Sequence, residues 1–295
     1  MLFCFMSYKF SGHESFICKN LWLKKGYDFK GNFNDESAVI DLGVGKNMVT
    51  SISYWLKAFG IVDTENNYSE LANYLLHDKK GVDPYIENIA TLWLLHYSLI
   101  KTNKASVYHL FFNQFRGKRT EFTKEHLYTF IKRILEDENQ KNFTENTIKS
   151  DIAVFIRSYL RPSYKETKID VEEDFSALLI DLNLMSNYEV ENVDSNKMVD
   201  WYKVEGKHQF DLPEEIVLFT ILDNYKGEKA ISFHELLNGT NSPGAVFCLT
   251  DDALYEKIEA ITQKHKQITY SESAGIRQIQ IKGTIDKWEV LNGCY

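Results

Sequence analysis

The chain has 295 residues, of which 44% are hydrophobic and 26% are charged, proportions that exclude a disordered or fibrous protein. Its formal net charge of −8 argues against a general nucleic-acid coat. The length is sufficient for two or three folding units, and the presence of only four prolines favours helices over loop-rich β-sandwiches. We therefore expect a mainly α protein with small β-hairpins, in which several helix-turn-helix or winged-helix units pack together.

The cysteines and the apolar segments predict the compartment. Four scattered cysteines form no CxxC pair and have no zinc-type spacing to histidine, which is typical of free thiols in a reducing cytoplasm. The apolar start, residues 1–6, lacks a basic leader and is too short for a signal peptide or a membrane span. We expect a cytoplasmic protein with no membrane partner.

The stretch FSGHESF, residues 10–16, concentrates polar side chains, with His13 and Glu14 adjacent between serines. Such a pair can act as acid and base or share a divalent metal such as Mg²⁺ or Mn²⁺, although no third ligand can be placed. We interpret His13 and Glu14 as the candidate catalytic residues. Nearby cations that could hold phosphate are Lys19, Lys24 and Lys25. The competing interpretation is structural, with both side chains bonding locally around a helix that begins near Ser15.

Residues 36–62 have the pattern of a helix-turn-helix. A short helix capped by Asp35 is followed by a glycine turn at 43–45, and a second helix capped by Asn47 ends at Gly60. Apolar residues recur along the second helix at the spacing of one buried face: Val49, Ile52, Leu56 and Phe59. In DNA-binding proteins of this kind, the second helix offers its N-terminal polar residues to the major groove.

The polar side of this second helix is the predicted DNA contact, and we expect the helix to begin within two residues of Lys46. Its candidate contacts are Lys46, Asn47, Thr50, Ser51 and Lys57. Residues 101–168 are also basic, with 14 Lys and Arg against eight Asp and Glu, a net +6. Five of these cations are predicted to share the same exposed face: Arg116, Lys118, Arg119, Lys149 and Arg157. A chance distribution of solvated charges is the alternative.

The middle of the chain is expected to be helical. Residues 85–100 are apolar on nearly all sides, which predicts a central buried helix. Periodicity over residues 124–137 and from Thr144 to Tyr159 indicates either a second helix-turn-helix or a plain helical pair. Residues 197–210 alternate as two strands would, with a turn at Glu205 and Gly206.

The last segment has the pattern of a winged helix. Ser232 caps a short helix, a longer helix starts at Asp251, and residues 267–281 alternate as a hairpin. Because the longer helix is acidic, and residues 169–225 carry 14 acids against three lysines, we expect this segment to bind protein rather than DNA. The predicted apolar contact area is Val246, Phe247 and Leu249. The predicted domains are residues 1–100, 101–210 and 211–295.

Several blocks of the sequence resemble a bacterial family known as a domain of unknown function. They are FSGHESF with WLKKGYDF, LGVGKNMVTSISYWLKAFG, ISFHELLNGTNSPGAVFCL and YSESAGIRQI, and the resemblance extends over the whole chain. The family includes the SspB-type proteins of single-stranded DNA phosphorothioation systems, to which a DNA-nicking activity is attributed. Lys19 stands where an arginine often follows FSGHESF in the family, and lysine keeps the charge but loses the bidentate geometry for phosphate.

The resemblance implies a phage-defence protein that binds double-stranded DNA and opens one strand, so that sulfur can replace a non-bridging phosphate oxygen. The implied partners are a cysteine desulfurase and a sulfonucleotide-reductase-like enzyme, and a homodimer is left open. Nicking usually requires a divalent metal, and the resemblance supplies no established catalytic residues. The alternative is a non-catalytic DNA-binding scaffold that recruits the sulfur-transfer enzymes. A plain transcriptional regulator fits the helix-turn-helix but not the rest of the chain.

Overall fold

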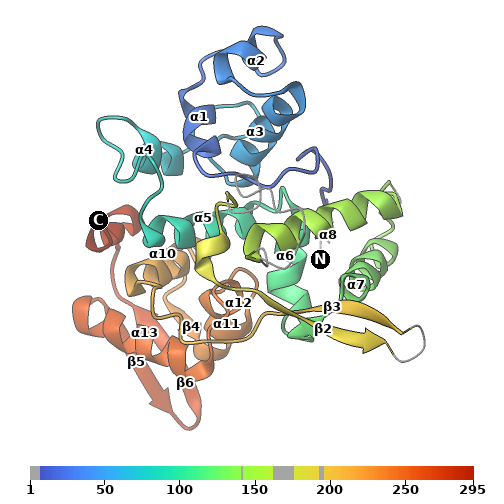
Figure 1. The fold of residues 1–295 in the computed structure, drawn as a ribbon. Coiled ribbons are helices and arrows are strands. Elements are labelled where there is room, and N and C mark those ends of the chain that lie inside the picture. The colour runs from blue at the N-terminus through green and yellow to red at the C-terminus, as the bar shows by residue number, and fades with distance from the viewer. Residues whose placement is uncertain (1–6, 141, 162–175, 193–195) are drawn as a thin grey trace. The chain divides into compact units, whose positions relative to one another are not determined.

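The computed structural model of the chain describes residues 7–140, 142–161, 176–192 and 196–295 (Figure 1). Tertiary contacts divide the chain into two compact units: unit 1 comprises residues 1–87 with 98–204, and unit 2 comprises residues 88–97 with 205–295. Helices predominate, and the strands of the described residues form two small three-stranded antiparallel sheets. The predicted fold class, mainly α with small β-hairpins, is confirmed at this level.

Unit 1 begins with short helices. They are α1 (Trp22–Asp28), α2 (Ser37–Leu42), α3 (Lys46–Ala58) and α4 (Glu70–Leu76). The predicted glycine turn joins α2 to α3, because Gly43 ends α2 in a left-handed conformation with φ 61°. The α3 helix begins at Lys46, as predicted, and its apolar stripe is buried. The predicted caps were wrong: Glu36 rather than Asp35 precedes α2, and Gly45 rather than Asn47 precedes α3.

The predicted buried helix is α5 (Ile89–Thr102), which supplies residues 89–97 to unit 2 and residues 98–102 to unit 1. It starts later than the predicted Tyr85, because Ile86 has a left-handed backbone with φ 59° that no helix continues through. The α6 helix (Ser106–Leu110) follows and runs into one π-helical turn, η1 (Phe111–Phe115). Phe111 of this turn contacts Phe122 and Phe155 with ring centroids 5.1 and 4.7 Å apart, so aromatic rings fill the core of unit 1.

The rest of unit 1 is a helical pair and a sheet. The helices α7 (Lys124–Asp137) and α8 (Glu145–Tyr159) pack together, and the predicted cap Thr144 accepts the Thr147 N–H at 3.2 Å. A short 3-10 helix, η2 (Ile180–Leu182), precedes the hairpin. The strands are β1 (Glu121–Phe122), β2 (Ser186–Asn192) and β3 (Lys197–Lys203), in the order β1-β3-β2. The predicted turn at 205–206 was wrong. The β3 strand pairs with β2, which precedes it in the sequence, and not with residues 207–210, which follow it.

Unit 2 contains the second sheet. Its helices are α10 (Glu214–Asn224), α11 (Phe233–Asn238), α12 (Pro243–Val246), α13 (Asp251–Lys264) and α14 (Lys287–Val290), with the 3-10 turn η3 (Leu291–Gly293). Its strands are β4 (Ala230–Ser232), β5 (Ile268–Ser273) and β6 (Ile276–Ile281), in the order β4-β6-β5. The predicted hairpin and the Ser232 cap are confirmed, with Ala274 and Gly275 supplying the positive φ angles of its tight turn.

One prediction for unit 2 was wrong. Val246, Phe247 and Leu249 offer no contact area, because all three are buried in its core. Phe247 packs edge-on against Trp93 of α5, with ring centroids 5.7 Å apart. Val246 ends α12 and the other two residues follow it, and all three point inward, so they cannot supply the predicted apolar contact area.

Two further observations concern thiols and membranes. Cys18, Cys248 and Cys294 are free thiols, and Cys4 lies outside the described residues. No helix in the described part of the chain is both long and apolar enough to span a bilayer.

The two compact units divide the chain within α5 and after Val204, whereas the ranges predicted from sequence divide it after residues 100 and 210.

Candidate functional site

The FSGHESF loop has an unusual backbone. Ser11, Gly12, Glu14 and Ser15 all have left-handed φ angles, of 73°, 105°, 48° and 64°. For residues other than glycine this conformation costs about 1–2 kcal/mol each, so neighbouring contacts must stabilise it. Gly12 is required for a second reason: a Cβ atom there would lie 2.6 Å from the Tyr54 ring. The surrounding structure therefore imposes this conformation.

His13 lies at the centre of the loop and is 4% exposed. Its Nδ1 atom accepts the Ser15 N–H at 3.1 Å, which assigns the ring proton to Nε2. The Nε2 atom lies 3.0 Å from Oδ1 of Asp151. The imidazole packs edge-on against Tyr54 and nearly parallel to Trp55. Both ring nitrogens are therefore engaged within the protein.

Asp151 is the partner that sequence reasoning did not connect to His13. It lies on α8 and is 5% exposed, and its two carboxylate oxygens accept the Ser11 N–H at 3.1 and 2.9 Å. The available signal was its position, since Asp151 falls on the buried stripe of α8 between Ile148 and Phe155. A carboxylate on an apolar helix face requires a buried partner.

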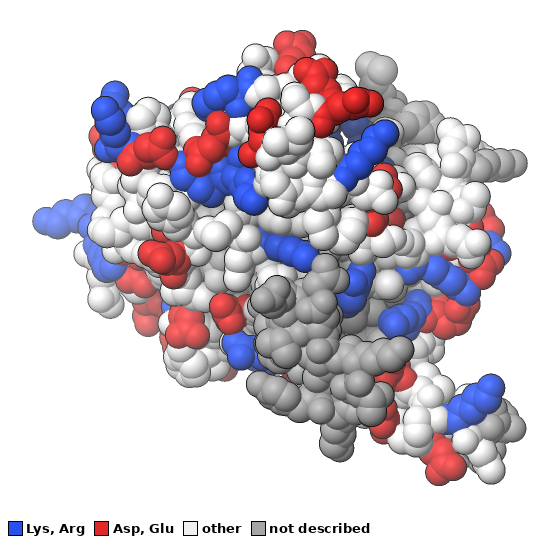
Figure 2. All heavy atoms as spheres, turned by 45° about the horizontal axis from the view of Figure 1, so that its top comes forward, with Lys and Arg blue, Asp and Glu red and all other residues white. Residues whose placement is uncertain are grey.

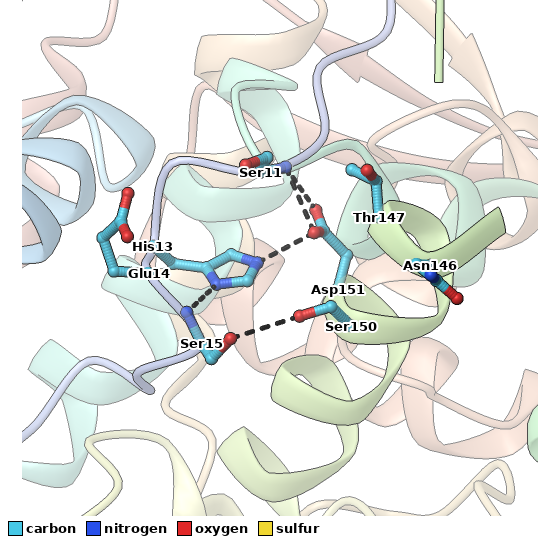
Figure 3. A pocket seen from close by; sticks show the side chains of 8 residues that line it. All are labelled: Ser11, His13, Glu14, Ser15, Asn146, Thr147, Ser150 and Asp151. Carbon is cyan, nitrogen blue, oxygen red and sulfur yellow. Dashed lines mark hydrogen bonds and ion pairs between the residues drawn. The ribbon is translucent and has the colours of Figure 1, made fainter. Parts of the chain in front are cut away.

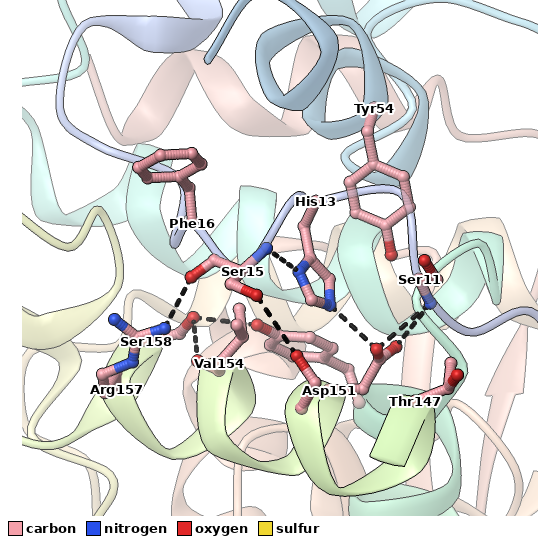
Figure 4. A network of polar contacts seen from close by, with 12 residues as sticks. Ser11, His13, Ser15, Phe16, Tyr54, Thr147, Asp151, Val154, Arg157 and Ser158 are labelled. Carbon is pink, nitrogen blue, oxygen red and sulfur yellow. Dashed lines mark hydrogen bonds and ion pairs between the residues drawn. The ribbon is translucent and has the colours of Figure 1, made fainter. Parts of the chain in front are cut away.

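Further contacts hold the loop against α3 and α8 (Figure 4). Arg157 donates to the Ser15 carbonyl at 2.6 Å, and the Trp55 indole donates to the Phe16 carbonyl at 3.2 Å. The hydroxyls of Ser15 and Ser150 lie 3.4 Å apart. Arg157, predicted to bind DNA, thus has a structural contact that orders the candidate site.

A polar pocket of about 340 Å³ opens between this loop and the first turns of α8 (Figure 3). Its lining consists of hydroxyl, amide, carboxylate and imidazole side chains: Ser11, His13, Glu14, Ser15, Asn146, Thr147, Ser150 and Asp151. Glu14 is exposed, whereas His13 and Asp151 are buried at the edge of the pocket. The pocket can therefore take a small polar or charged group.

In this arrangement His13 and Glu14 have different surroundings and therefore different possible roles. His13 is buried, with Nδ1 accepting the Ser15 N–H and Nε2 beside Asp151, so its contacts position the loop. The Glu14 side chain points away from Asp151 in Figure 3, so the two carboxylates do not converge. Within the described ranges, no three His, Cys, Asp or Glu side chains gather as metal ligands. The residues present do not by themselves form a closed metal site.

The lysines that follow the loop differ in environment. Lys24 is buried and bonded to Asp28 at 2.7 Å, to Asp78 and to a backbone carbonyl, which corrects its assignment to DNA. Lys25 is exposed and donates to the Leu42 carbonyl at the end of α2 at 2.9 Å. Lys19 is half-buried and lies 5.9 Å from the centre of the Trp22 ring. Lys24 is therefore not available to a phosphate, whereas Lys19 and Lys25 stay predicted contacts.

The predicted DNA contacts on α3 are mostly exposed. Lys46, Asn47 and Thr50 reach solvent on its first turns, and Lys57 is half-buried near its end. Ser51 is fully buried, which corrects its assignment, because it lies beside Ile52 on the core side of the helix. The polar surface at the start of α3 is thus Lys46, Asn47 and Thr50, called the α3 surface below.

Comparison with known proteins identifies the family. Residues 10–295 match the family described as "Protein of unknown function (DUF4007)". The chain belongs to the DUF4007 family. Its fold is similar to a magnesium-bound crystal structure of SspB, with a TM-score of 0.81, 25% sequence identity, and coverage of 97% of this chain and 88% of that chain. A second SspB crystal structure gives a TM-score of 0.80 at the same identity and coverage. Among curated proteins, none matches the chain. The SspB-like resemblance predicted from the sequence is confirmed.

The other basic residues predicted to bind DNA have different contacts. Lys149 pairs with Glu145 at 2.7 Å and with Glu125 at 3.5 Å, and Lys118 lies over the Phe130 ring. Arg116 is half-buried, whereas Arg119 is exposed. On the face drawn in Figure 2, basic side chains lie among acidic ones and make no continuous stripe. A single basic face that joins the middle of the chain to α3 stays a prediction.

Proposed function

We propose that this protein is the DNA-binding component of a DNA phosphorothioation system. The proposal is supported by its likeness to SspB, which extends over 97% of the chain rather than over one module. A system that replaces a phosphate oxygen with sulfur must hold its target DNA in register with the sulfur-transfer enzymes. A chain with separate nucleic-acid and protein surfaces suits that task.

The α3 surface is the observation that carries this proposal. Lys46, Asn47 and Thr50 are exposed at the start of α3, while Val49 and Ile52 of the same helix lie in the core. This is how a recognition helix places polar side chains against base edges in the major groove. The free amides at the start of the helix also favour a phosphate there.

Unit 2 is proposed to bind a partner enzyme. We propose that unit 2 is a winged helix with α13 as its recognition helix, a proposal supported by its order of α10, β4, α11, α12, α13 and the β5–β6 hairpin. That helix carries four acids, Asp251, Asp252, Glu256 and Glu259. Like charges would repel phosphate, so a basic surface of the cysteine desulfurase or the sulfonucleotide-reductase-like enzyme is the proposed partner. Ile276 of the hairpin, 63% exposed, supplies apolar area.

Duplex binding through α3 can be tested by reversing one charge. The Lys46→Glu variant is expected to bind duplex DNA more weakly than the wild type, because it loses a phosphate contact and adds a repulsive charge. Its salt dependence, as the slope of log K against log[salt], should become shallower by about 0.9. Fluorescence anisotropy titrations of a labelled duplex at several salt concentrations measure both quantities.

The matched control for this experiment is Lys80→Glu, which makes the same charge change at an exposed lysine after α4. Lys80→Glu should leave the salt slope close to that of the wild type. Equal losses in both variants would mean that net charge alone governs binding. Duplex affinity unchanged in Lys46→Glu would remove α3 from the interface.

Strand nicking is a second proposal, favoured by the polar pocket beside the FSGHESF loop. Purified protein with added Mg²⁺ or Mn²⁺ should convert a supercoiled plasmid into its open circular form. Glu14→Gln should slow this by about 100-fold if the exposed Glu14 carboxylate transfers a proton. Glu36→Gln removes an exposed carboxylate elsewhere and serves as the control. Equal rates for wild type and Glu14→Gln would exclude Glu14 from the reaction, and no conversion at all would favour the scaffold alternative.

A further inference from the structure

The β2–β3 hairpin of unit 1 is a two-stranded ribbon (Figure 1), and one of its faces is aromatic and apolar. Tyr188 lies directly across from Trp201, and Val190 directly across from Val199, so these four side chains share one face. All seven residues of β2 are exposed, with Tyr188 and Val190 each at 40%. A contiguous patch of this kind on a soluble protein marks a binding surface.

The rings of this hairpin face are held in place by their neighbours. The Tyr188 and Trp201 rings are nearly parallel, with an interplanar angle of 19° and centroids 6.4 Å apart. His126 of α7 packs against Trp201, with centroids 5.3 Å apart. The Tyr188 hydroxyl donates to Glu121 at 3.0 Å. Because the rings are already ordered, a ligand that stacks on them loses little additional side-chain entropy.

Charged side chains differ between the two faces of the hairpin, and the aromatic face includes the Glu121 carboxylate, which contacts both Tyr188 and Lys203. Lys197 and Lys203 lie on the aromatic face at the two ends of β3, with Lys203 also 3.2 Å from Glu121. Burial and the positive charge of Arg119 lower the pKa of His126, and the negative charge of Glu125 acts in the opposite direction. The opposite face carries the carboxylates Glu189, Glu191 and Asp200. The aromatic face therefore suits a ligand that combines planar rings with negative charge.

We propose that the aromatic face of the β2–β3 hairpin binds single-stranded DNA. Unpaired bases would stack on Tyr188 and Trp201, while Lys197 attracts the phosphate backbone. Duplex DNA cannot use the rings, because its bases are stacked inside the helix. This inference rests on the proposed DNA function and adds to it a hold on a strand that has been separated from its complement.

A protein ligand is a weaker match to this face. A segment that adds to the sheet would pair with the open edge of β2, where backbone groups rather than aromatic faces supply the contacts. An acidic peptide would match the lysines but would have no planar groups for Tyr188 and Trp201. A second copy of this chain would bring Glu189 and Glu191 against their own counterparts at a shared β2 edge.

The test compares single-stranded and duplex DNA on the full chain. Anisotropy titrations would use a labelled oligo-dT strand of about 16 nucleotides, a length that covers one such site. Trp201→Ala and Tyr188→Ala should each weaken single-strand binding roughly 5- to 150-fold, the loss expected for one stacked base. Duplex affinity should be unchanged in both variants. Trp201→Phe keeps an aromatic ring and should retain most of the single-strand affinity.

Met198→Ala is the matched control, because Met198 is 57% exposed on the opposite face of the same hairpin. It should not alter single-strand binding, and circular dichroism should show all variants folded. The proposal would be overturned if single-strand affinity were unchanged in both Trp201→Ala and Tyr188→Ala. If those two variants instead lost binding to a purified partner enzyme, the aromatic face would be a protein-binding surface. Wild-type binding of duplex but not of oligo-dT would overturn it while the proposed function stands. Binding of neither DNA would overturn both.

Discussion

Replacing Asp151 with alanine is expected to lower the free energy of unfolding by about 3 kcal/mol. A hydrogen bond to a charged group contributes about 1.5–3 kcal/mol, and the upper end applies here because both oxygens of the buried Asp151 carboxylate accept the Ser11 N–H. The substitution removes the carboxylate that accepts the Ser11 N–H at 2.9 Å and lies 3.0 Å from His13 Nε2. The left-handed backbone of the FSGHESF loop would then lose a main support.

Urea denaturation followed by circular dichroism measures this loss. Asp151→Asn should be affected less than Asp151→Ala, because its side-chain oxygen can still accept the Ser11 N–H. Ser150→Ala, one position earlier on α8, removes only a 3.4 Å hydroxyl contact and should stay within about 0.5 kcal/mol of the wild type. An Asp151→Ala protein as stable as the wild type would show that the loop is held without this carboxylate.

Acidification is expected to destabilise unit 2 through His96. This side chain of α5 is fully buried and lies 2.9 Å from the Val246 carbonyl, with Trp93 and Phe247 around its ring. Burial lowers the pKa of His96 from 6.5 to about 4, and the hydrogen bond to Val246 offsets only part of that shift. The folded protein therefore keeps His96 neutral at pH values where the unfolded chain protonates it.

The sign of the pH dependence follows from that lowered pKa. Above about pH 6.5 both states hold His96 neutral, and its environment costs no stability there. As the pH falls from 6.5 towards 4, only the unfolded state binds the proton, so the free energy of unfolding falls. The loss should reach about 2 kcal/mol at pH 5 and about 3 kcal/mol at pH 4. Urea midpoints at pH 7.5, 6 and 5 would measure it.

A His96→Gln variant separates this contribution from others. Glutamine keeps an N–H donor for the Val246 carbonyl but does not titrate, so the variant should lose less stability between pH 6.5 and 5 than the wild type does. Some slope should remain, because burial also lowers the pKa of His109. Carboxylates with a lowered pKa, such as Asp251 beside Arg277, lose their stabilisation at lower pH. Identical slopes for wild type and variant would contradict the assignment to His96.

Local features of the sequence predicted most helices correctly. The start of α3 at Lys46, the cap at Thr144 and the cap at Ser232 each depend on a few neighbouring residues. An apolar stripe at helical spacing and a side chain that bonds the first free amide act over one or two turns. Their consequences can therefore be predicted from the sequence without the rest of the fold.

Burial and strand pairing were predicted less well, because both depend on what packs against a segment. The sequence predicted that Lys24 and Ser51 are surface residues, yet the fold buries both inside unit 1. Val246, Phe247 and Leu249 were predicted to form an exposed contact area, but they lie in the core of unit 2. The alternation of residues 197–210 correctly indicated a strand at β3, but periodicity does not say which segment supplies the pairing strand.

The sequence by itself determined the helical character of this protein, its glycine-linked α2–α3 pair and its SspB-like family. The tertiary structure alone decided the candidate site. It brings Asp151 to the FSGHESF loop across a separation of 140 residues from Ser11, and it places His13 Nε2 beside that carboxylate. A hydrogen bond between such distant residues leaves no periodic pattern in either segment, because it forms only once α3 and α8 have packed around the loop.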